Sequence, residues 1–260
     1  MVKRFLHSLK VKISQLIHPV VQRDWTAIDA IGSLNGKNRD QWIAQELAKI
    51  PAGYSLLDAG AGEQPYRQYC QHLHYISQDF AEYKPEALQE GLQMKNWDYG
   101  VLDIISDVTR IPRPDASFDV VLCTEVIEHI VNPIDAIKEF SRLLKPGGQL
   151  ILTAPFCSMT HFAPYHFYSG YNRFFYESVL PGYGFEIIEM KENGNYFEYV
   201  AQELKRLEAI GQKYAEMNQT DEVKQSLNVL LDYIQKCSSK DKGSNELMFF
   251  GMHVKAVKKG

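Results

Sequence analysis

An acid and two glycines follow an apolar run in residues 55–65, S-L-L-D-A-G-A-G-E-Q-P. Two leucines ahead of Asp58 predict a short buried parallel strand, and Gly60 and Gly62 allow a tight turn into a helix. Because glycine has no Cβ atom, backbone N–H groups of such a turn can approach a ligand at the helix N-terminus. The next predicted strand ends in Asp79, 21 residues after Asp58, about where nucleotide-binding folds carry a ribose-binding acid. These spacings predict a strand, loop and helix that bind a nucleotide.

Two histidines lie in the aromatic-rich segment 156–171, directly after the fifth predicted strand. His161 and His166 are therefore expected at the carboxyl end of the sheet, where α/β folds place their ligands. An imidazole titrates near neutrality, so either ring suits the removal of a proton from a hydroxyl group. We predict His166 and His161 as catalytic residues, and His129 is a third candidate.

Glu125, Glu128 and His129 form the motif E-x-x-E-H. The spacing i, i+3 and i+4 puts all three side chains on one face if this turn is helical. Two carboxylates and an imidazole suit Mg²⁺, Mn²⁺ or Zn²⁺. The same residues also fit a site without metal, in which Glu125 lies near a cofactor and His129 packs or caps.

Three blocks of the sequence resemble class I S-adenosylmethionine-dependent methyltransferases. The first motif of that family, acid-x-Gly-x-Gly-x-Gly, is matched by Asp58, Gly60 and Gly62. Its third glycine is absent, since Gln64 stands there. The other blocks are an acid ahead of an I-P pair, Asp107, and the run S-F-D-V-V-L-C-T-E-V-I-E-H at residues 117–129. The chain is identified as a member of the broad subset with an E-V-I-E-H motif.

The resemblance implies S-adenosylmethionine as the cofactor and assigns cofactor-binding roles to six residues. The methionine portion is assigned to Asp58, Gly60 and Gly62, the ribose hydroxyls to Asp79, the adenine amine to Asp107, and a place near the cofactor to Glu125. A dinucleotide fingerprint would need a glycine at position 65, where the chain has Pro65. NAD and FAD are therefore disfavoured.

The resemblance further implies methyl transfer, and the residues favour an oxygen acceptor. The candidate bases are histidines, and residues 153–156 read T-A-P-F in place of the asparagine-proline-proline-tyrosine motif of amino methylation. We predict a small-molecule, sugar or lipid-linked glycan acceptor. The E-x-x-E-H motif resembles the metal site of methyltransferases that act on quinone precursors or on small-RNA 3′ ends, but it is also common in metal-free relatives. We predict no metal and little effect of EDTA.

Three alternatives remain open from the sequence. The first is a metal-dependent O-methyltransferase that uses Glu125, Glu128 and His129, with His161 or His166 as a fourth ligand. The second is a non-catalytic binding or assembly protein with a methyltransferase-like fold. The third is a nicotinamide oxidoreductase, which Pro65 disfavours.

Composition limits the partners and the compartment. The formal net charge of −4 gives no basic signature, so no nucleic acid partner is predicted. The four cysteines are widely spaced without a C-x-x-C pair, which is typical of reduced thiols in a cytoplasmic protein: Cys70, Cys123, Cys157 and Cys237. No apolar run approaches the ~18 residues of a membrane span.

Residues 1–18 carry an apolar stripe with basic flanks. At about 100° per residue the stripe predicts an amphipathic helix. Its apolar residues are Val2, Phe5, Leu6, Leu9, Ile13, Leu16 and Ile17. Such a helix either packs on its own domain or lies in a membrane interface as a peripheral contact.

These residues need an α/β scaffold to bring them together. We predict a Rossmann-like, seven-stranded, mostly parallel sheet with helices on both faces, an antiparallel last strand and a helical insertion before that strand. Residues 1–39 are predicted as the N-terminal helix and linker, and residues 40–258 as the methyltransferase domain. The insertion, residues 196–237, reads as two helices that form a lid, a dimer surface or packing only.

Overall fold

The structure, a computed structural model, describes residues 30–85, 90–94 and 96–260. The helix predicted for residues 1–18 and the start of the linker lie outside the described residues. None of the helices in the described part is long and apolar enough to cross a membrane.

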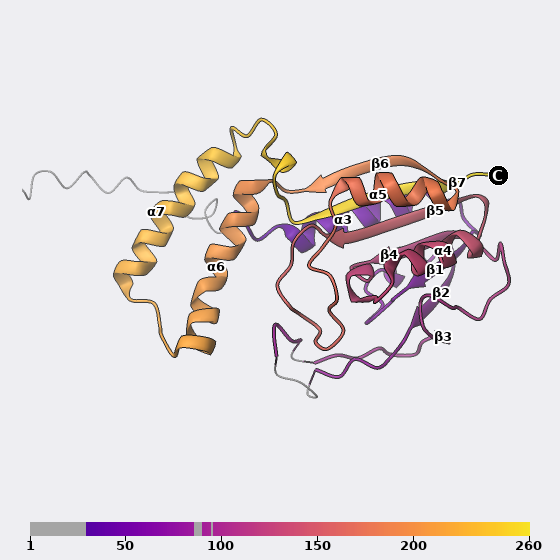
Figure 1. Cartoon of the computed structure of the whole chain (residues 1–260), viewed down its shortest axis with the longest axis horizontal. Coiled ribbons are helices and arrows are strands. Elements are labelled where there is room, and N and C mark those ends of the chain that lie inside the picture. Colours follow the sequence, from indigo (N-terminus) through magenta and orange to yellow (C-terminus); the bar gives the residue numbers. More distant parts are fainter. Residues whose placement is uncertain (1–29, 86–89, 95) are drawn as a thin grey trace, which may run out of the picture.

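A seven-stranded sheet forms the centre of the molecule, in the order β3-β2-β1-β4-β5-β7-β6 (Figure 1). Its strands are β1 (Ser55–Ala59), β2 (His74–Asp79), β3 (Ile104–Ile105), β4 (Phe118–Thr124), β5 (Leu144–Pro155), β6 (Phe185–Asn193) and β7 (Gly251–Lys258). The pairs from β3 through to β5 are parallel, and β7 runs antiparallel to both β5 and β6. The predicted fold class, with its antiparallel last strand, is confirmed.

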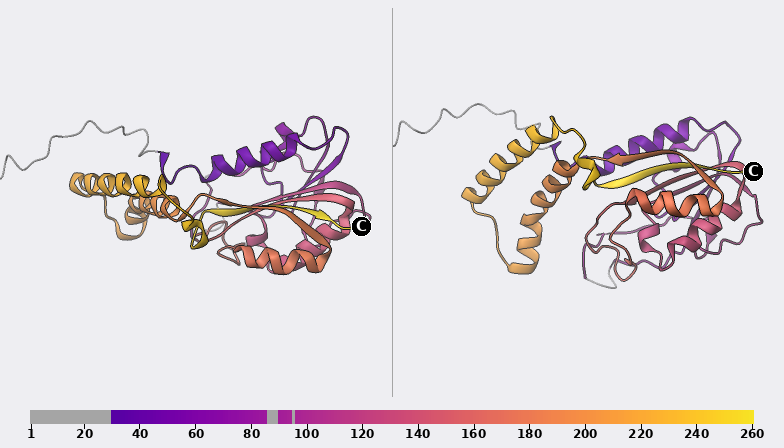
Figure 2. Two further views of the ribbon diagram at one scale, coloured as in Figure 1. Left: turned by 90° about the horizontal axis from the view of Figure 1, so that it is seen from above. Right: turned by 45° about the horizontal axis from the view of Figure 1, so that its top comes forward.

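Helices cover both faces of the sheet. Helix α3 (Asn35–Ala48) lies on one face, whereas α4 (Pro133–Leu143) and α5 (Arg173–Val179) lie on the other (Figure 2). The residues of α4 that are fully buried fall at helical spacing and turn one stripe to the core: Ala136, Ile137, Phe140 and Leu143. Pro133 occupies the first turn of α4, where its missing N–H costs no helical hydrogen bond, and the Asn132 side chain makes no capping hydrogen bond. Burial on both faces holds the strand ends in fixed positions.

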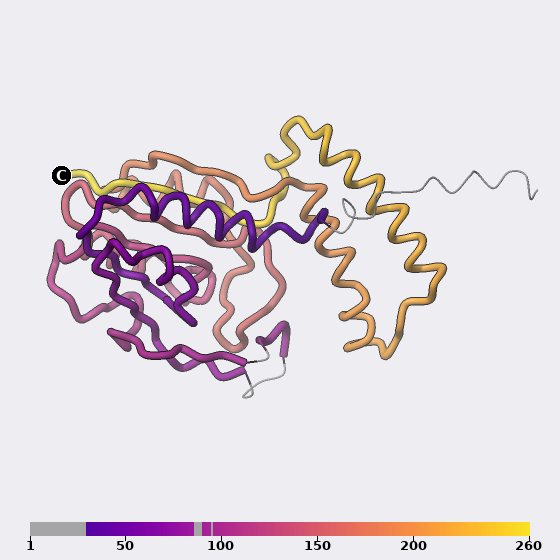
Figure 3. The backbone as a smooth tube through the Cα atoms, turned by 180° about the vertical axis from the view of Figure 1, so that it is seen from behind, coloured from indigo at the N-terminus to yellow at the C-terminus, as the bar shows by residue number. Residues whose placement is uncertain are grey.

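Two helices project from the sheet between β6 and β7 (Figure 3). They are α6 (Tyr196–Ala215) and α7 (Asp221–Ser238), and they match the predicted insertion. Asn195 caps α6 and Thr220 caps α7, each by accepting a backbone N–H with its side chain. Ile31, near the start of the described chain, is buried against α6 and α7 in a small cluster with Ala201, Leu231 and Ile234.

Two predicted elements are shorter than expected. The sequence favours a helix at residues 64–71, after the glycine loop, but the structure has only the 3-10 turn η1 (Arg67–Tyr69), and Gln64, with a left-handed φ of 58°, lies outside any helix. The sequence also favours a third strand within residues 101–112, of which only β3 forms. Here the Asp103 carboxylate accepts the N–H and hydroxyl of Ser77, at 2.9 Å each, in place of a backbone ladder.

Helix α3 begins at Asn35, within the segment 1–39 that the sequence predicts as N-terminal helix and linker. The predicted boundary between residues 39 and 40 therefore falls inside a helix. The division of the chain into two domains stays a prediction.

Replacing Phe140 on α4 should test how far this packing sets stability. Phe140 is 0 % exposed in the main core cluster, so Phe140→Ala should lower the free energy of unfolding by about 3–5 kcal/mol through lost burial and a cavity. Phe174 on α5 is 60 % exposed, so Phe174→Ala should change the free energy of unfolding by no more than about 0.5 kcal/mol. Urea unfolding of both variants measures the difference, and equal losses would contradict the assigned core.

Candidate functional site

The predicted site residues come from loops at the carboxyl ends of the parallel strands. Parallel strands end at the same edge of a sheet, so the loops after β1, β2, β4 and β5 converge there. Several non-glycine residues in these loops have φ between 53° and 58°: Gln64, Ala81, Glu125 and Phe162. Left-handed backbone at non-glycine residues costs free energy and tends to cluster at functional sites. This edge is therefore the candidate site.

The glycine loop after β1 is bonded to the end of β2. The N–H groups of Gly60 and Ala61 both donate to the Gln78 carbonyl at 2.8 Å, and the Gly62 N–H donates to Asp79 Oδ2 at 2.9 Å. The expectation that these N–H groups face a ligand is therefore wrong. The glycines are needed for fit, since a Cβ on Gly60 would lie 2.4 Å from a methyl carbon of Val126.

Asp58 and Asp79 are both buried at the ends of neighbouring strands. Burial raises the pKa of Asp58 to about 7, although the Tyr75 hydroxyl donates a hydrogen bond to its Oδ2 at 2.6 Å and lowers it. Burial also raises the pKa of Asp79, against the lowering effect of N–H bonds from Ala81 and Gly62. Each acid thus has a structural partner already, and each keeps acceptor capacity for a ligand.

Asp107 follows Ser106, whose carbonyl accepts a hydrogen bond from Gln78 Nε2 at 2.6 Å. It is exposed, and its Oδ1 accepts hydrogen bonds from the N–H and hydroxyl of Thr109 at 2.8 and 2.7 Å. This is the geometry of a capped turn. The adenine role of Asp107 stays a prediction.

Glu125 is held from two sides. Its Oε1 accepts a hydrogen bond from the Thr153 hydroxyl at 2.9 Å, and its Oε2 pairs with the Arg39 guanidinium at 3.2 Å. Burial lowers the pKa of Arg39, but Glu125, Tyr66 and Asp40 together raise it by more, and the net direction is upward. Sequence reasoning missed Arg39, because it lies on α3, 86 residues before its partner, and no local pattern links the two.

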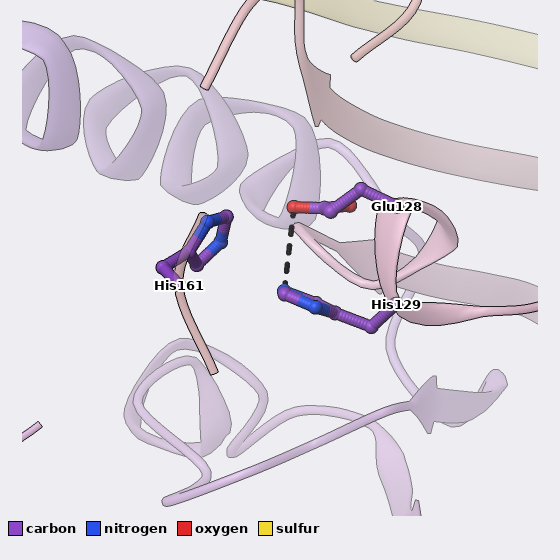
Figure 4. A group of neighbouring side chains, drawn as sticks. All are labelled: Glu128, His129 and His161. Carbon is purple, nitrogen blue, oxygen red and sulfur yellow. Dashed lines mark ion pairs between the residues drawn. The ribbon is translucent and has the colours of Figure 1, made fainter. Parts of the chain in front are cut away.

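The histidines form a cluster with Glu128 (Figure 4). Ring centroids are 4.7 Å apart for His129 and His161, and 4.6 Å apart for His161 and His166. Nδ1 of His129 is hydrogen-bonded to the Tyr165 carbonyl, and Nδ1 of His161 to the Met159 carbonyl at 2.9 Å. A carbonyl only accepts, so both rings carry the proton on Nδ1 and have an unprotonated Nε2 when neutral.

The charges of this cluster are shifted by burial. Burial, with help from His161, lowers the pKa of His129 to about 3, and burial also lowers the pKa values of His161 and His166. Glu128 is 0 % exposed, and neither carboxylate oxygen has a hydrogen-bond partner among the described residues. Burial and the nearby Glu125 raise its pKa well above the usual range. At neutral pH the raised pKa of Glu128 disfavours its negative charge, and the lowered pKa of His129 disfavours its positive charge. The 3.7 Å contact between Glu128 Oε1 and His129 Nε2 therefore does not join two opposite charges.

One set of atoms in this cluster could hold a metal ion. A ligand atom from each of Glu128, His129 and His161 lies within 4.8 Å of the other two. The third ligand is thus His161, whereas Glu125 belongs to the Arg39 pair. Imidazole and carboxylate together suit Zn²⁺, Mn²⁺ or Fe²⁺.

The middle of the chain matches a known family. A family model described as a methyltransferase domain covers residues 57–152, well under half of the chain. Demethylmenaquinone methyltransferase of Clavibacter sepedonicus is 31 % identical over 132 residues, which are 49 % of this chain and 53 % of that protein. A ubiquinone biosynthesis O-methyltransferase of Leptothrix cholodnii is 28 % identical over 118 residues, which are 44 % of this chain and 49 % of that protein. The chain thus spans about half the length of the curated relatives it matches.

Solved structures share the whole fold at low identity. A SAM-dependent methyltransferase from Archaeoglobus fulgidus matches with a TM-score of 0.52 and 14 % identity, over 85 % of this chain and 94 % of that one. The [4+2]-cyclase SpnF matches with a TM-score of 0.53 and 17 % identity, over 86 % of this chain and 82 % of that one. Since a cyclase shares the fold, the fold does not decide the reaction.

The raised pKa of Asp58 predicts a pH-dependent stability. The folded chain holds the Asp58 proton up to about pH 7, whereas the unfolded chain releases it near 3.8. Stability from this group is complete below about pH 3.8 and is lost as the pH rises through about 7. Wild type should therefore lose stability relative to Asp58→Asn between pH 4.5 and 7.5, by on the order of 3 kcal/mol. Urea unfolding at both pH values measures this, and a constant difference would contradict the assigned burial.

Proposed function

We propose, since this chain carries an S-adenosylmethionine-dependent methyltransferase domain in residues 57–152, that it transfers a methyl group from this cofactor to a hydroxyl oxygen. The predicted enzyme class and cofactor are confirmed at the level of that domain. The acceptor that we propose is a small molecule, a sugar or a lipid-linked glycan. The nicotinamide alternative loses its basis, because the glycine loop belongs to a methyltransferase domain.

The polar groups around the glycine loop fit S-adenosylmethionine. The ribose hydroxyls and the amino group of this cofactor are hydrogen-bond donors, and its sulfonium carries a positive charge. The side chains at the loop are acids, Asp58, Asp79 and Glu125, whose oxygens accept hydrogen bonds and which favour positive charge when they are ionised. When bound, the cofactor supplies an activated methyl group, and the residues of the chain must orient the acceptor, exclude water and take up a proton.

The observation that carries the proposal is the histidine cluster beside this edge. His161 donates from Nδ1 to a carbonyl, so its bare Nε2 can accept the hydroxyl proton while the acceptor oxygen takes the methyl group. The lowered pKa keeps the ring neutral and ready to act as a base. His166 is the second candidate, and its Nε2 lies 3.2 Å from the Ser158 hydroxyl.

A hollow beside the cluster suits an acceptor. It lies between the loop after β2 and the histidine segment, and it is lined by Ala81, Glu82, Tyr83, Lys84, Ala163, Pro164 and Tyr165. The Tyr165 carbonyl also holds His129, so the hollow adjoins the histidines. Relatives named as O-methyltransferases support a hydroxyl acceptor.

A metal-dependent version of the same reaction is the second candidate. Glu128 favours it, because its buried carboxylate has no hydrogen-bond partner among the residues that the structure describes, and a bound cation would compensate its charge. Glu128, His129 and His161 would hold the ion, which would lower the pKa of an acceptor hydroxyl. If the cofactor binds but no extract yields a methylated product, the chain is instead a non-catalytic binding protein.

Binding of S-adenosylhomocysteine should depend on Asp79. Asp79→Asn keeps the shape but removes the charge, and affinity should fall by about 1.5–3 kcal/mol, the range for hydrogen bonds to charged groups. Asp221→Asn, at an exposed position in the first turn of the projecting helix α7, serves as the matched control and should change affinity by less than about 0.5 kcal/mol. Calorimetric titration measures both, and equal affinity of Asp79→Asn and wild type would remove Asp79 from the site.

The two mechanisms differ in their response to EDTA. With an acceptor found by screening extracts with labelled cofactor, His161→Gln should lower kcat by about 10²- to 10⁴-fold while S-adenosylhomocysteine affinity stays nearly intact. If the reaction is metal-free, as the sequence predicts, EDTA leaves activity unchanged. Loss of activity on chelation, restored by Mn²⁺ or Zn²⁺, would replace the metal-free mechanism by the Glu128 site. A fully active His161→Gln would contradict both.

We also propose that residues 1–18 make a peripheral membrane contact. Support comes from the described chain, which starts beside a projecting hairpin with exposed apolar side chains: Leu207, Tyr214, Met217, Val223 and Leu230. The protein should co-sediment with anionic vesicles and lose this binding in Leu9→Asp/Ile13→Asp or at high salt. Ser8→Asp/Ser14→Asp adds the same charge off the stripe and should retain most binding. Absence of vesicle binding in wild type would return the segment to packing on its own domain.

A further inference from the structure

The segment 97–101 crosses the glycine loop and is fastened to it. Gln64 donates from Nε2 to the carbonyls of Tyr99 and Val101, at 2.8 and 3.0 Å. The neighbouring Glu63 accepts the Asp98 N–H at 3.1 Å. Two consecutive loop residues therefore hold one short segment, which we call the strap, residues 97–101.

Gln64 is oriented for this task by its backbone and by a neighbour. Its φ of 58° is the left-handed conformation that glycine favours, so the loop keeps that conformation although the third glycine of the motif is absent. Arg67 donates to Gln64 Oε1 at 2.8 Å, which directs the amide N–H groups toward the strap. The side chain in place of the glycine thus has every polar atom bonded.

The strap places Trp97 on the glycine loop. A Cβ built on Gly62 would lie 2.9 Å from Trp97 Cζ2, so the indole is in direct contact with the loop. The indole also contacts Phe162, with ring centroids 4.9 Å apart, and Phe162 contacts His129 at 5.3 Å. Ring contacts therefore run without a break from the glycine loop to the histidine cluster.

We propose that Gln64 is a positioning residue that keeps Trp97 against the glycine loop and thereby limits release of the bound cofactor. The proposal rests on the proposed function, since it concerns the same cofactor site. A cofactor that leaves the loop at Gly62 must pass or displace Trp97, and the Gln64 amide opposes that movement with two hydrogen bonds. Gln64 thus has the left-handed backbone conformation that the family glycine favours, and its side chain acts as a latch, by which we mean its two hydrogen bonds to the strap.

The direct test compares variants that keep the backbone and remove the latch. Gln64→Glu has the same size but no amide donor, and Gln64→Gly fits the positive φ without strain. Gln68→Ala is the matched control, because its amide bonds only the local Pro65 carbonyl at 2.9 Å. Trp97 fluorescence reports on the strap in a Trp25→Phe background, with the buried Trp42 as a constant signal.

Two readouts are needed. Without ligand, acrylamide should quench Trp97 more strongly in both Gln64 variants than in wild type or Gln68→Ala. In stopped flow, S-adenosylhomocysteine should leave both Gln64 variants about tenfold faster, which corresponds to about 1.4 kcal/mol. If both Gln64 variants show the same quenching and the same dissociation rate as wild type, the latch is overturned. It is also overturned if quenching changes while the dissociation rate stays at the wild-type value.

Failure of the proposed function has a different signature. If wild type binds no S-adenosylhomocysteine by calorimetry, the cofactor assignment fails and the proposed role of Gln64 in release fails with it, whatever the quenching shows. If wild type binds and the variants release the ligand at the wild-type rate, only the latch fails.

Discussion

The hydrogen bond from the Gly62 N–H to the Asp79 carboxylate joins the ends of two neighbouring strands, and the candidate cofactor site depends on it. Together with the bonds from Gly60 and Ala61 to the Gln78 carbonyl, it fixes the path of the glycine loop. A carboxylate that orders the backbone is held in one orientation, so its remaining lone pairs are preorganised for a ligand. The loop in turn presents Gln64 and Gly62 to the strap, and the strap carries Trp97 to the ring contacts that reach the histidines.

A second constraint acts on the other half of the edge. Glu128 lies wholly inside the protein without a hydrogen-bond partner in the described part of the chain, and a charged carboxylate there would be strongly disfavoured. The group is therefore either protonated or compensated by a cation. The same burial keeps His129 neutral, and a neutral imidazole serves both as a base and as a metal ligand. One cluster thus supports two mechanisms, which differ in whether an ion is bound and in whether His161 acts as a base or as a metal ligand.

The sequence predicts elements whose cause is local and misses those whose cause is distant. The apolar runs and the placement of the glycines are enough to predict β1, its loop and β2. The sequence also predicts the two helices of the insertion, and Asn195 and Thr220 cap them. The approach of His161, in the loop after β5, to His129, in the loop after β4, follows from the rule that the loops of parallel strands converge at one edge of a sheet. The Arg39–Glu125 pair and the strap depend on contacts between residues 35 to 86 positions apart, and the short turn after Gln64 accompanies one left-handed residue. No pattern in a short window carries that information.

The central claim is that one edge of the sheet holds the cofactor at the glycine loop and the acceptor at the histidines. A crystal structure of the complex with S-adenosylhomocysteine, grown with Mn²⁺ present, tests it most directly. The account predicts the ribose at Asp79, the sulfur directed toward the His129 and His161 rings, and Trp97 in contact with the bound ligand. Anomalous scattering would reveal an ion among Glu128, His129 and His161 if the metal mechanism holds. A ligand bound away from the Gly60–Gly62 loop, or a sulfur directed away from the histidines, would contradict the account.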